Sequence, residues 1–135
     1  MAMNARWDIP ALKDGGFVTL TFAAPVLVIA RLVHDSNSRS PYLVPLVLLA
    51  ITGFVLGAGV AAWRQRSQTP LSHGIVTAVG TFTAVQTVLV IINLIRGSDI
   101  AWFSIFFNLT TTLGAGCLGG LLGMVLHRSG LESRR

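Results

Sequence analysis

Four long apolar segments constrain the fold of this chain most strongly. They comprise residues 17–33, 42–63, 71–95 and 100–126, and a helix needs roughly 20 residues at 1.5 Å per residue to cross a bilayer. Only 11% of the residues are charged, against about 25% in a typical soluble domain. A water-soluble protein of 135 residues cannot hide this much apolar surface. We therefore expect a single all-α membrane domain, a four-helix bundle in the lipid bilayer.

The first segment is the least regular of the four. Pro25 lies near its middle and Arg31 near its end, but an arginine can extend its guanidinium to the interface, which keeps a span feasible. A cleaved signal peptide is the alternative. Asp8 and Asp14 precede the apolar run, and no small-x-small cleavage site precedes the next span. A retained helix is preferred, with the preceding residues, Trp7 among them, at the membrane interface.

The orientation follows from the basic residues in the short polar loops and at the ends. Short loops make consecutive helices antiparallel neighbours. Seven basic residues then fall on the side of the termini and three on the other: Arg6, Lys13, Arg64, Arg66, Arg128, Arg134 and Arg135 against Arg31, Arg39 and Arg96. The positive-inside rule predicts cytoplasmic termini and a multi-pass protein of the cytoplasmic (inner) membrane. The net charge of +5 is scattered in ones and twos, which indicates membrane anchors and no nucleic-acid partner.

The run GAGCLGG, residues 114–120, contains the spacing G-x-G-x-x-G. A dinucleotide site with this spacing needs a strand before the glycines, a helix after them and an acidic residue about 20 positions further on. Here the glycines lie inside an apolar span, and the chain ends fifteen residues after Gly120. The sequence therefore predicts no cofactor at this point.

We interpret the glycines as helix-packing positions instead. In lipid, faces of small residues let two helix backbones approach closely. At about 100° per residue such faces occur on the second, third and fourth segments, and the predicted packing residues are Gly53, Gly57, Gly80, Gly116, Gly119, Gly120 and Gly123. The faces fit one tight bundle, or a bundle that leaves one face for a second copy or a partner.

Three amide side chains form a candidate polar site within the spans: Gln86, Asn93 and Asn108. Intramembrane polar groups are costly and often functional. Interhelical hydrogen bonds, worth about 0.6 to 2 kcal/mol each, are the favoured interpretation, and a lining for a substrate or ion is the alternative. All acidic residues lie outside the spans or at their edges, so proton-coupled transport lacks its usual intramembrane carboxylate.

The remaining reactive side chains form no recognisable constellation. His73 and His127 lie at span ends, where interfacial histidines without metal-ligand spacing are expected. Cys117, the single cysteine, lies among glycines and is expected to be a small packing residue. The sequence thus predicts no catalytic, metal-binding or cofactor-binding residues, and no enzyme.

The runs PLSHGIVTAVGTFTAV and FNLTTTLGAGCLGGLLG in the C-terminal half support a family resemblance. They resemble the small four-helix bacterial membrane proteins of unknown function that include the YrzE-type proteins. The last helix of that family carries an A-x-x-G-G-x-L-G-like element, matched here by Ala115, Gly119, Gly120, Leu122 and Gly123. The resemblance implies a cytoplasmic-membrane location and no known activity.

Two functions are compatible with these patterns. The first is a structural or accessory membrane protein that packs through its glycine and alanine faces, as a homo-oligomer or in a larger membrane complex. The alternative is a small transporter or channel component with a polar intramembrane lining.

Overall fold

The computed structural model describes residues 7–130, which form four helices joined by short loops. The helices are α1 (Ile9–Ser36), α2 (Leu43–Arg64), α3 (Pro70–Ile95) and α4 (Trp102–Arg128). Each of the four is long and apolar enough to cross a membrane. The predicted all-α, four-helix membrane fold is confirmed, and the chain is a small polytopic membrane protein.

The first helix begins eight residues before the apolar segment that predicted it. The Asp8 side chain accepts a hydrogen bond from the Ala11 backbone N–H, and a proline stands in the first turn of α1. An acidic N-cap followed by proline is a strong start signal for a helix. Residues 9–16, which were expected to lie at the interface before the span, therefore belong to α1.

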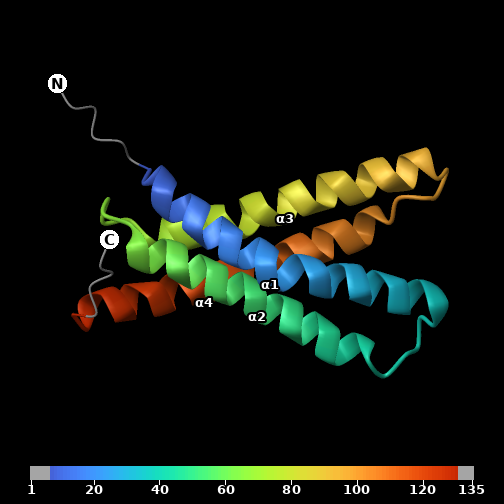
Figure 1. Ribbon diagram of the computed structural model, residues 1–135, viewed down its shortest axis with the longest axis horizontal. Coiled ribbons are helices and arrows are strands. Elements are labelled where there is room, and N and C mark those ends of the chain that lie inside the picture. Colours follow the sequence, from blue (N-terminus) through green and yellow to red (C-terminus); the bar gives the residue numbers. More distant parts are fainter. Residues whose placement is uncertain (1–6, 131–135) are drawn as a thin grey trace.

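The helices form two hairpins, α1–α2 and α3–α4, that pack against each other. Helix α2 contacts each of the other three, whereas α1 contacts α2 and α3. The hairpins lie close together where α1 begins and α4 ends, and they diverge toward the α1–α2 and α3–α4 loops (Figure 1). We call these the closed end and the open end of the bundle.

Small residues bring the hairpins together at the closed end. A Cβ atom added at Gly119 of α4 would lie 2.6 Å from Ala58 Cβ and 2.9 Å from Gly59 N of α2. One added at Gly123 would lie 2.5 Å from Ala62 Cβ. Real Cβ atoms do not make contacts this short, so α2 and α4 approach each other at a distance that only glycine permits.

The same kind of contact joins the other helix pairs. Gly57 of α2 lies against Gly15 and Thr19 of α1, and Gly74 of α3 lies against Gly116 and Gly120 of α4. The structure thus places six of the seven predicted packing glycines in contacts between helices of this chain: Gly53, Gly57, Gly116, Gly119, Gly120 and Gly123.

Gly80 is the exception, because it makes no close packing contact with another helix within residues 7–130. It is exposed, and no atom lies within 4 Å of a Cβ built on it. The buried face of α3 follows the line Gly74, Ala78 and Phe82 at intervals of four residues. Gly80 is turned away from that line.

Two phenylalanine rings mark the level at which the hairpins separate. Phe54 of α2 and Phe82 of α3 pack with their ring centroids 6.5 Å apart, in a buried cluster that includes Ala58, Ala78 and Ala115. On the closed side of these rings most contacts are made by small residues, chiefly alanine, glycine and threonine. On the open side the helices no longer fill the space between them.

Candidate functional site

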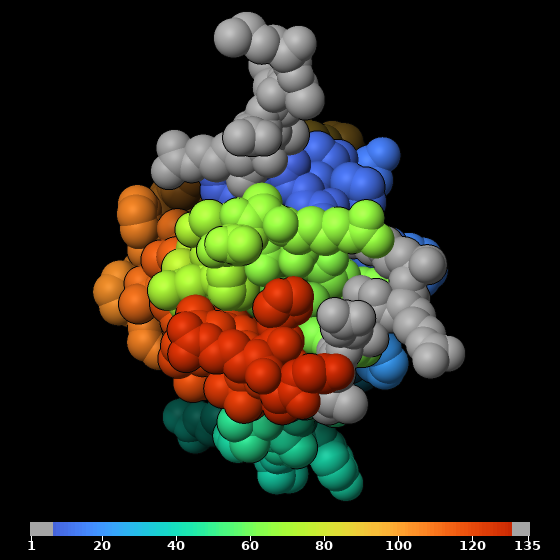
Figure 2. All heavy atoms as spheres, turned by 90° about the vertical axis from the view of Figure 1, so that its left-hand side faces the viewer, coloured from blue at the N-terminus to red at the C-terminus, as the bar shows by residue number. Residues whose placement is uncertain are grey.

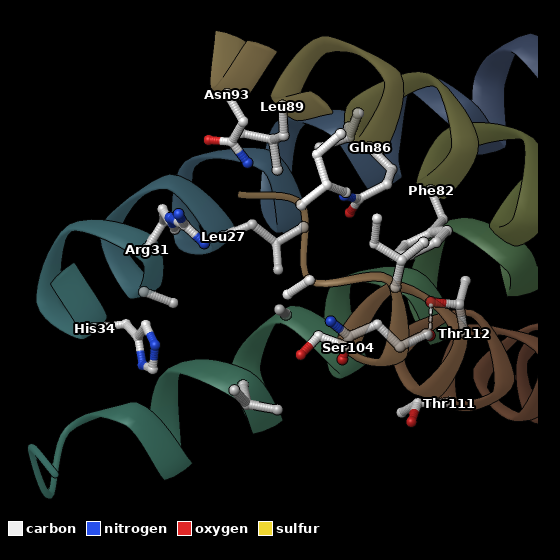
Figure 3. Close-up of a pocket in the computed structure, with 18 of the residues that line it drawn as sticks. Leu27, Arg31, His34, Phe82, Gln86, Leu89, Asn93, Ser104, Thr111 and Thr112 are labelled. Atoms are coloured by element: carbon white, nitrogen blue, oxygen red, sulfur yellow. Dashed lines mark hydrogen bonds between the residues drawn. The ribbon is translucent and has the colours of Figure 1, made fainter. Parts of the chain in front are cut away.

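A cavity of about 520 Å³ occupies the space between the diverging hairpins. Residues of all four helices and of the α3–α4 loop line it, and Figure 3 shows most of these side chains. Phe54 and Phe82 belong to its lining and to the buried cluster. These rings therefore form its floor, and the cavity extends from them to the open end.

Most of the wall is apolar. Aliphatic side chains from each hairpin contribute, among them Leu27 of α1, Ile51 of α2, Leu89 of α3 and Ile105 of α4. Binding cavities for small molecules are usually lined in this way, with a few polar groups that fix the orientation of the ligand.

The three amide side chains predicted as a polar site all line this cavity. At 1.5 Å per residue, Gln86 lies about 14 Å along α3 from the helix end at Ile95, and Asn93 lies in the last turn of α3. Asn108 lies about 9 Å along α4 from its first residue. The amides therefore form a polar track on α3 and α4, from the mouth to roughly mid-membrane.

Interhelical hydrogen bonds, the favoured interpretation of these amides, are not what the structure contains. Within residues 7–130, the amides of Gln86, Asn93 and Asn108 donate no hydrogen bond to another residue and accept none. The neighbouring hydroxyls bond within their own helix instead, as Thr112 Oγ1 donates to the Asn108 carbonyl oxygen at 2.8 Å. The amide groups are thus available to whatever occupies the cavity.

Charged side chains gather at the mouth. Arg31 of α1, Arg96 at the end of α3 and Asp99 in the α3–α4 loop belong to the lining, together with His34. Arg31 Nε lies 3.2 Å from Asp35 Oδ1, and both side chains are nearly half exposed, so this ion pair contributes at most about 1 kcal/mol. The sequence predicted that Arg31 extends to the membrane interface, and it did not predict that Arg31 lines a cavity. Leu27 and Arg31 are four residues apart, a spacing that places both on one face of α1, the face that lines the cavity.

A second polar cluster lies at the closed end, around His73. The ring is fully buried, which corrects the expectation of an interfacial histidine. Its Nε2 accepts a hydrogen bond from the Asp8 backbone N–H at 3.0 Å, and its Nδ1 lies 2.9 Å from the Thr69 carbonyl oxygen. Because a backbone N–H only donates and a carbonyl only accepts, these two contacts match the tautomer of His73 that carries its proton on Nδ1.

Hydrogen bonds and an ion pair around His73 connect the start of α1 to the α2–α3 loop and the end of α2. Asp8 Oδ2 accepts from the Arg66 backbone N–H at 3.0 Å, and the buried Gln65 Oε1 accepts from the Thr69 backbone N–H at 3.1 Å. Arg64 Nη1 pairs with Asp14 Oδ2 at 2.9 Å. In the view onto the closed end, the loop lies in green between α1 in blue and α4 in red (Figure 2). Each of these polar groups bonds within the protein, so we assign the cluster a structural role.

Fold and site together define a small four-span membrane protein with a partly polar cavity. Comparison with known protein families, with curated proteins and with solved structures finds no match to this chain.

Proposed function

We propose that this chain is a small transporter, or the ligand-binding component of one, that holds a small molecule between its two hairpins. One observation carries this proposal. Gln86, Asn93 and Asn108 line a single cavity, and their amides have no hydrogen-bond partner within residues 7–130. Polar groups at membrane depth are costly when they lack hydrogen-bond partners. A ligand or water in the cavity would supply these partners. The cavity volume of about 520 Å³ lies within the usual range for small-molecule sites.

The proposal includes an orientation. Seven basic residues on the side of the termini against three on the other favour cytoplasmic termini, in the cytoplasmic membrane. The α1–α2 and α3–α4 loops would then lie on the opposite face of that membrane, and the ligand would enter from that face.

A structural or accessory role, the other function compatible with the sequence, has less support. It was motivated by small-residue faces that could receive a second copy or a partner. Six of the seven glycines on those faces lie against helices of the same chain, and only Gly80 is left on the surface. We therefore favour ligand binding, with no catalytic step.

The test uses a side chain that fills the cavity. We expect native mass spectrometry of the protein, purified in a mild detergent, to show a retained small molecule in the wild type and not in Gln86→Trp. Leu118→Trp is the matched control, because Leu118 is 58% exposed on the outer face of α4 and does not line the cavity. Equal retention by both variants would contradict the proposal.

A further inference from the structure

The mouth and the depth of the cavity differ in chemistry. At the mouth, two guanidinium groups come from different hairpins, Arg31 on α1 and Arg96 at the end of α3. Toward the floor, most of the wall consists of aliphatic and aromatic side chains that end at Phe54 and Phe82, and the amides of Gln86 and Asn108 lie among them. The cavity is therefore amphipathic along its length, with charged groups at the membrane surface and a mainly apolar wall, interrupted by two amides, toward the middle of the bundle.

Donor groups at the mouth, and not its net charge, favour an anion. Arg31, Arg96 and the carboxylate of Asp99 belong to the lining, and Asp35 pairs with Arg31, so the formal charges of these four groups cancel. Arg31 is paired through Nε with Asp35, so its terminal nitrogens remain for a second acceptor. Arg96 makes no ion pair within residues 7–130. Guanidinium groups match phosphate and carboxylate oxygens in a bidentate geometry.

Asn93 adds a neutral donor beside these charges. It lies three residues before Arg96 on α3, so the two share one face of the helix, and both line the cavity. In Figure 3, Asn93, Arg31 and Leu27 lie at the same end of the cavity, while Gln86 and Phe82 lie further along it. A head group at the mouth would meet guanidinium and amide donors, and an attached chain would lie along Leu27, Leu89 and Phe82.

We infer that the ligand is an amphiphile with one acidic head group, a phosphate or carboxylate held by Arg31 and Arg96, and an apolar chain that extends toward Phe54 and Phe82. This inference rests on the proposed binding function and names its ligand class. The volume of about 520 Å³ is that of a site for a drug-sized molecule. It suits a single-chain amphiphile better than a lipid with two chains.

The test compares two single-chain lipids that differ only in the head group. Native mass spectrometry of the full chain in an uncharged detergent would measure binding of lysophosphatidylglycerol, an anion, and lysophosphatidylcholine, a zwitterion, with the same acyl chain. Both head groups carry a phosphate, but the choline cation of the zwitterion is repelled by the two guanidinium groups and offsets the charge of its phosphate, so we expect a preference of about tenfold for the anion. Equal binding, or a preference for the zwitterion, would overturn the inference.

Substitutions at Arg31 and Arg96 test whether these two residues cause the preference for the anionic lipid. We expect Arg31→Gln/Arg96→Gln to abolish it, and Arg31→Lys/Arg96→Lys to keep part of it, because lysine retains the charge without the bidentate geometry. Arg39→Gln is the matched control, since Arg39 lies in the α1–α2 loop at the same end but does not line the cavity. An unchanged preference in both double variants would overturn the inference, and so would an equal loss in Arg39→Gln.

Lipid binding to Gln86→Trp distinguishes failure of this inference from failure of the proposed binding function on which it rests. If Gln86→Trp blocks both lipids while neither is preferred, ligand binding stands and the acidic head group is wrong. If Gln86→Trp blocks neither, the lipids bind elsewhere and both proposals fail. Inorganic phosphate at the same concentration is expected not to compete, because it lacks the chain that contacts the apolar wall, and effective competition would assign the site to a free anion instead.

Discussion

At the scale of single residues, His73 shows how a buried polar group is satisfied by a distant part of the chain. Its ring accepts from the backbone of Asp8, 65 positions earlier in the sequence. The sequence places His73 at the start of a span, where an interfacial position is the ordinary expectation. The start of α1 covers the His73 ring, and the N-cap at Asp8 determines where α1 begins. The burial of His73 was therefore not predictable from its own neighbourhood.

We predict that His73→Phe lowers the free energy of unfolding by about 1 kcal/mol or more, because it removes the hydrogen bonds that the fully buried ring makes to Asp8 and Thr69. Thermal unfolding in detergent measures this as a lower midpoint temperature. His127→Phe serves as the control, since His127 is exposed at the end of α4. Its free energy of unfolding should stay within about 0.5 kcal/mol of the wild-type value. Equal effects of the two substitutions would contradict the assigned hydrogen bonds.

At the scale of the elements, helical periodicity predicted most of the close-packing face of α4 but not its partner. Gly116, Gly119 and Gly123 were assigned to one face, and the structure shows this face against α2 and α3. The pattern on α3 was less informative, because small residues occur on more than one of its faces. Gly80 fell on the predicted strip, whereas the line Gly74, Ala78 and Phe82 makes the contacts.

Two glycines of α4 allow a test in which alanine is expected to destabilise the protein at one position and not at the other. Gly119→Ala places a Cβ atom 2.6 Å from Ala58 Cβ, and such overpacking costs about 1 to 3 kcal/mol. Gly114→Ala meets no atom within 4 Å and gains helix propensity of up to about 1 kcal/mol. We expect thermal unfolding to show a lower midpoint for Gly119→Ala and an unchanged or higher one for Gly114→Ala. Destabilisation of both to the same extent would mean that α4 is packed differently.

At the scale of the whole molecule, hydropathy was sufficient to predict the four-helix membrane bundle. The four apolar segments match the four helices within a few residues, except at the start of α1. The cavity was not predictable in the same way, because it arises from the angle between two hairpins. That angle depends on where glycine contacts end and the Phe54–Phe82 pair begins. The sequence identified the amides of the cavity as a set, but it left open whether they would bond to each other or line a space.

The central claim is that the bundle is closed at one end and has an open, partly polar cavity between its hairpins at the other. Cysteine labelling with a charged thiol reagent that does not cross membranes tests it most directly, in vesicles and in a Cys117→Ser background. Single cysteines at Gln86 in the cavity, Ala78 in the closed end, and Leu118 on the outer face of α4 would be compared. Arg39→Cys in the α1–α2 loop marks the side of the open end.

We predict that Gln86→Cys reacts from the same side as Arg39→Cys, because water and the reagent reach it through the open end. Ala78→Cys is expected to react from neither side, since that position is fully buried. Leu118→Cys is expected to react slowly, because lipid surrounds it and suppresses the thiolate. Reaction of Gln86→Cys at the slow rate of Leu118→Cys, or from the side opposite Arg39→Cys, would contradict a cavity that opens between the two hairpins.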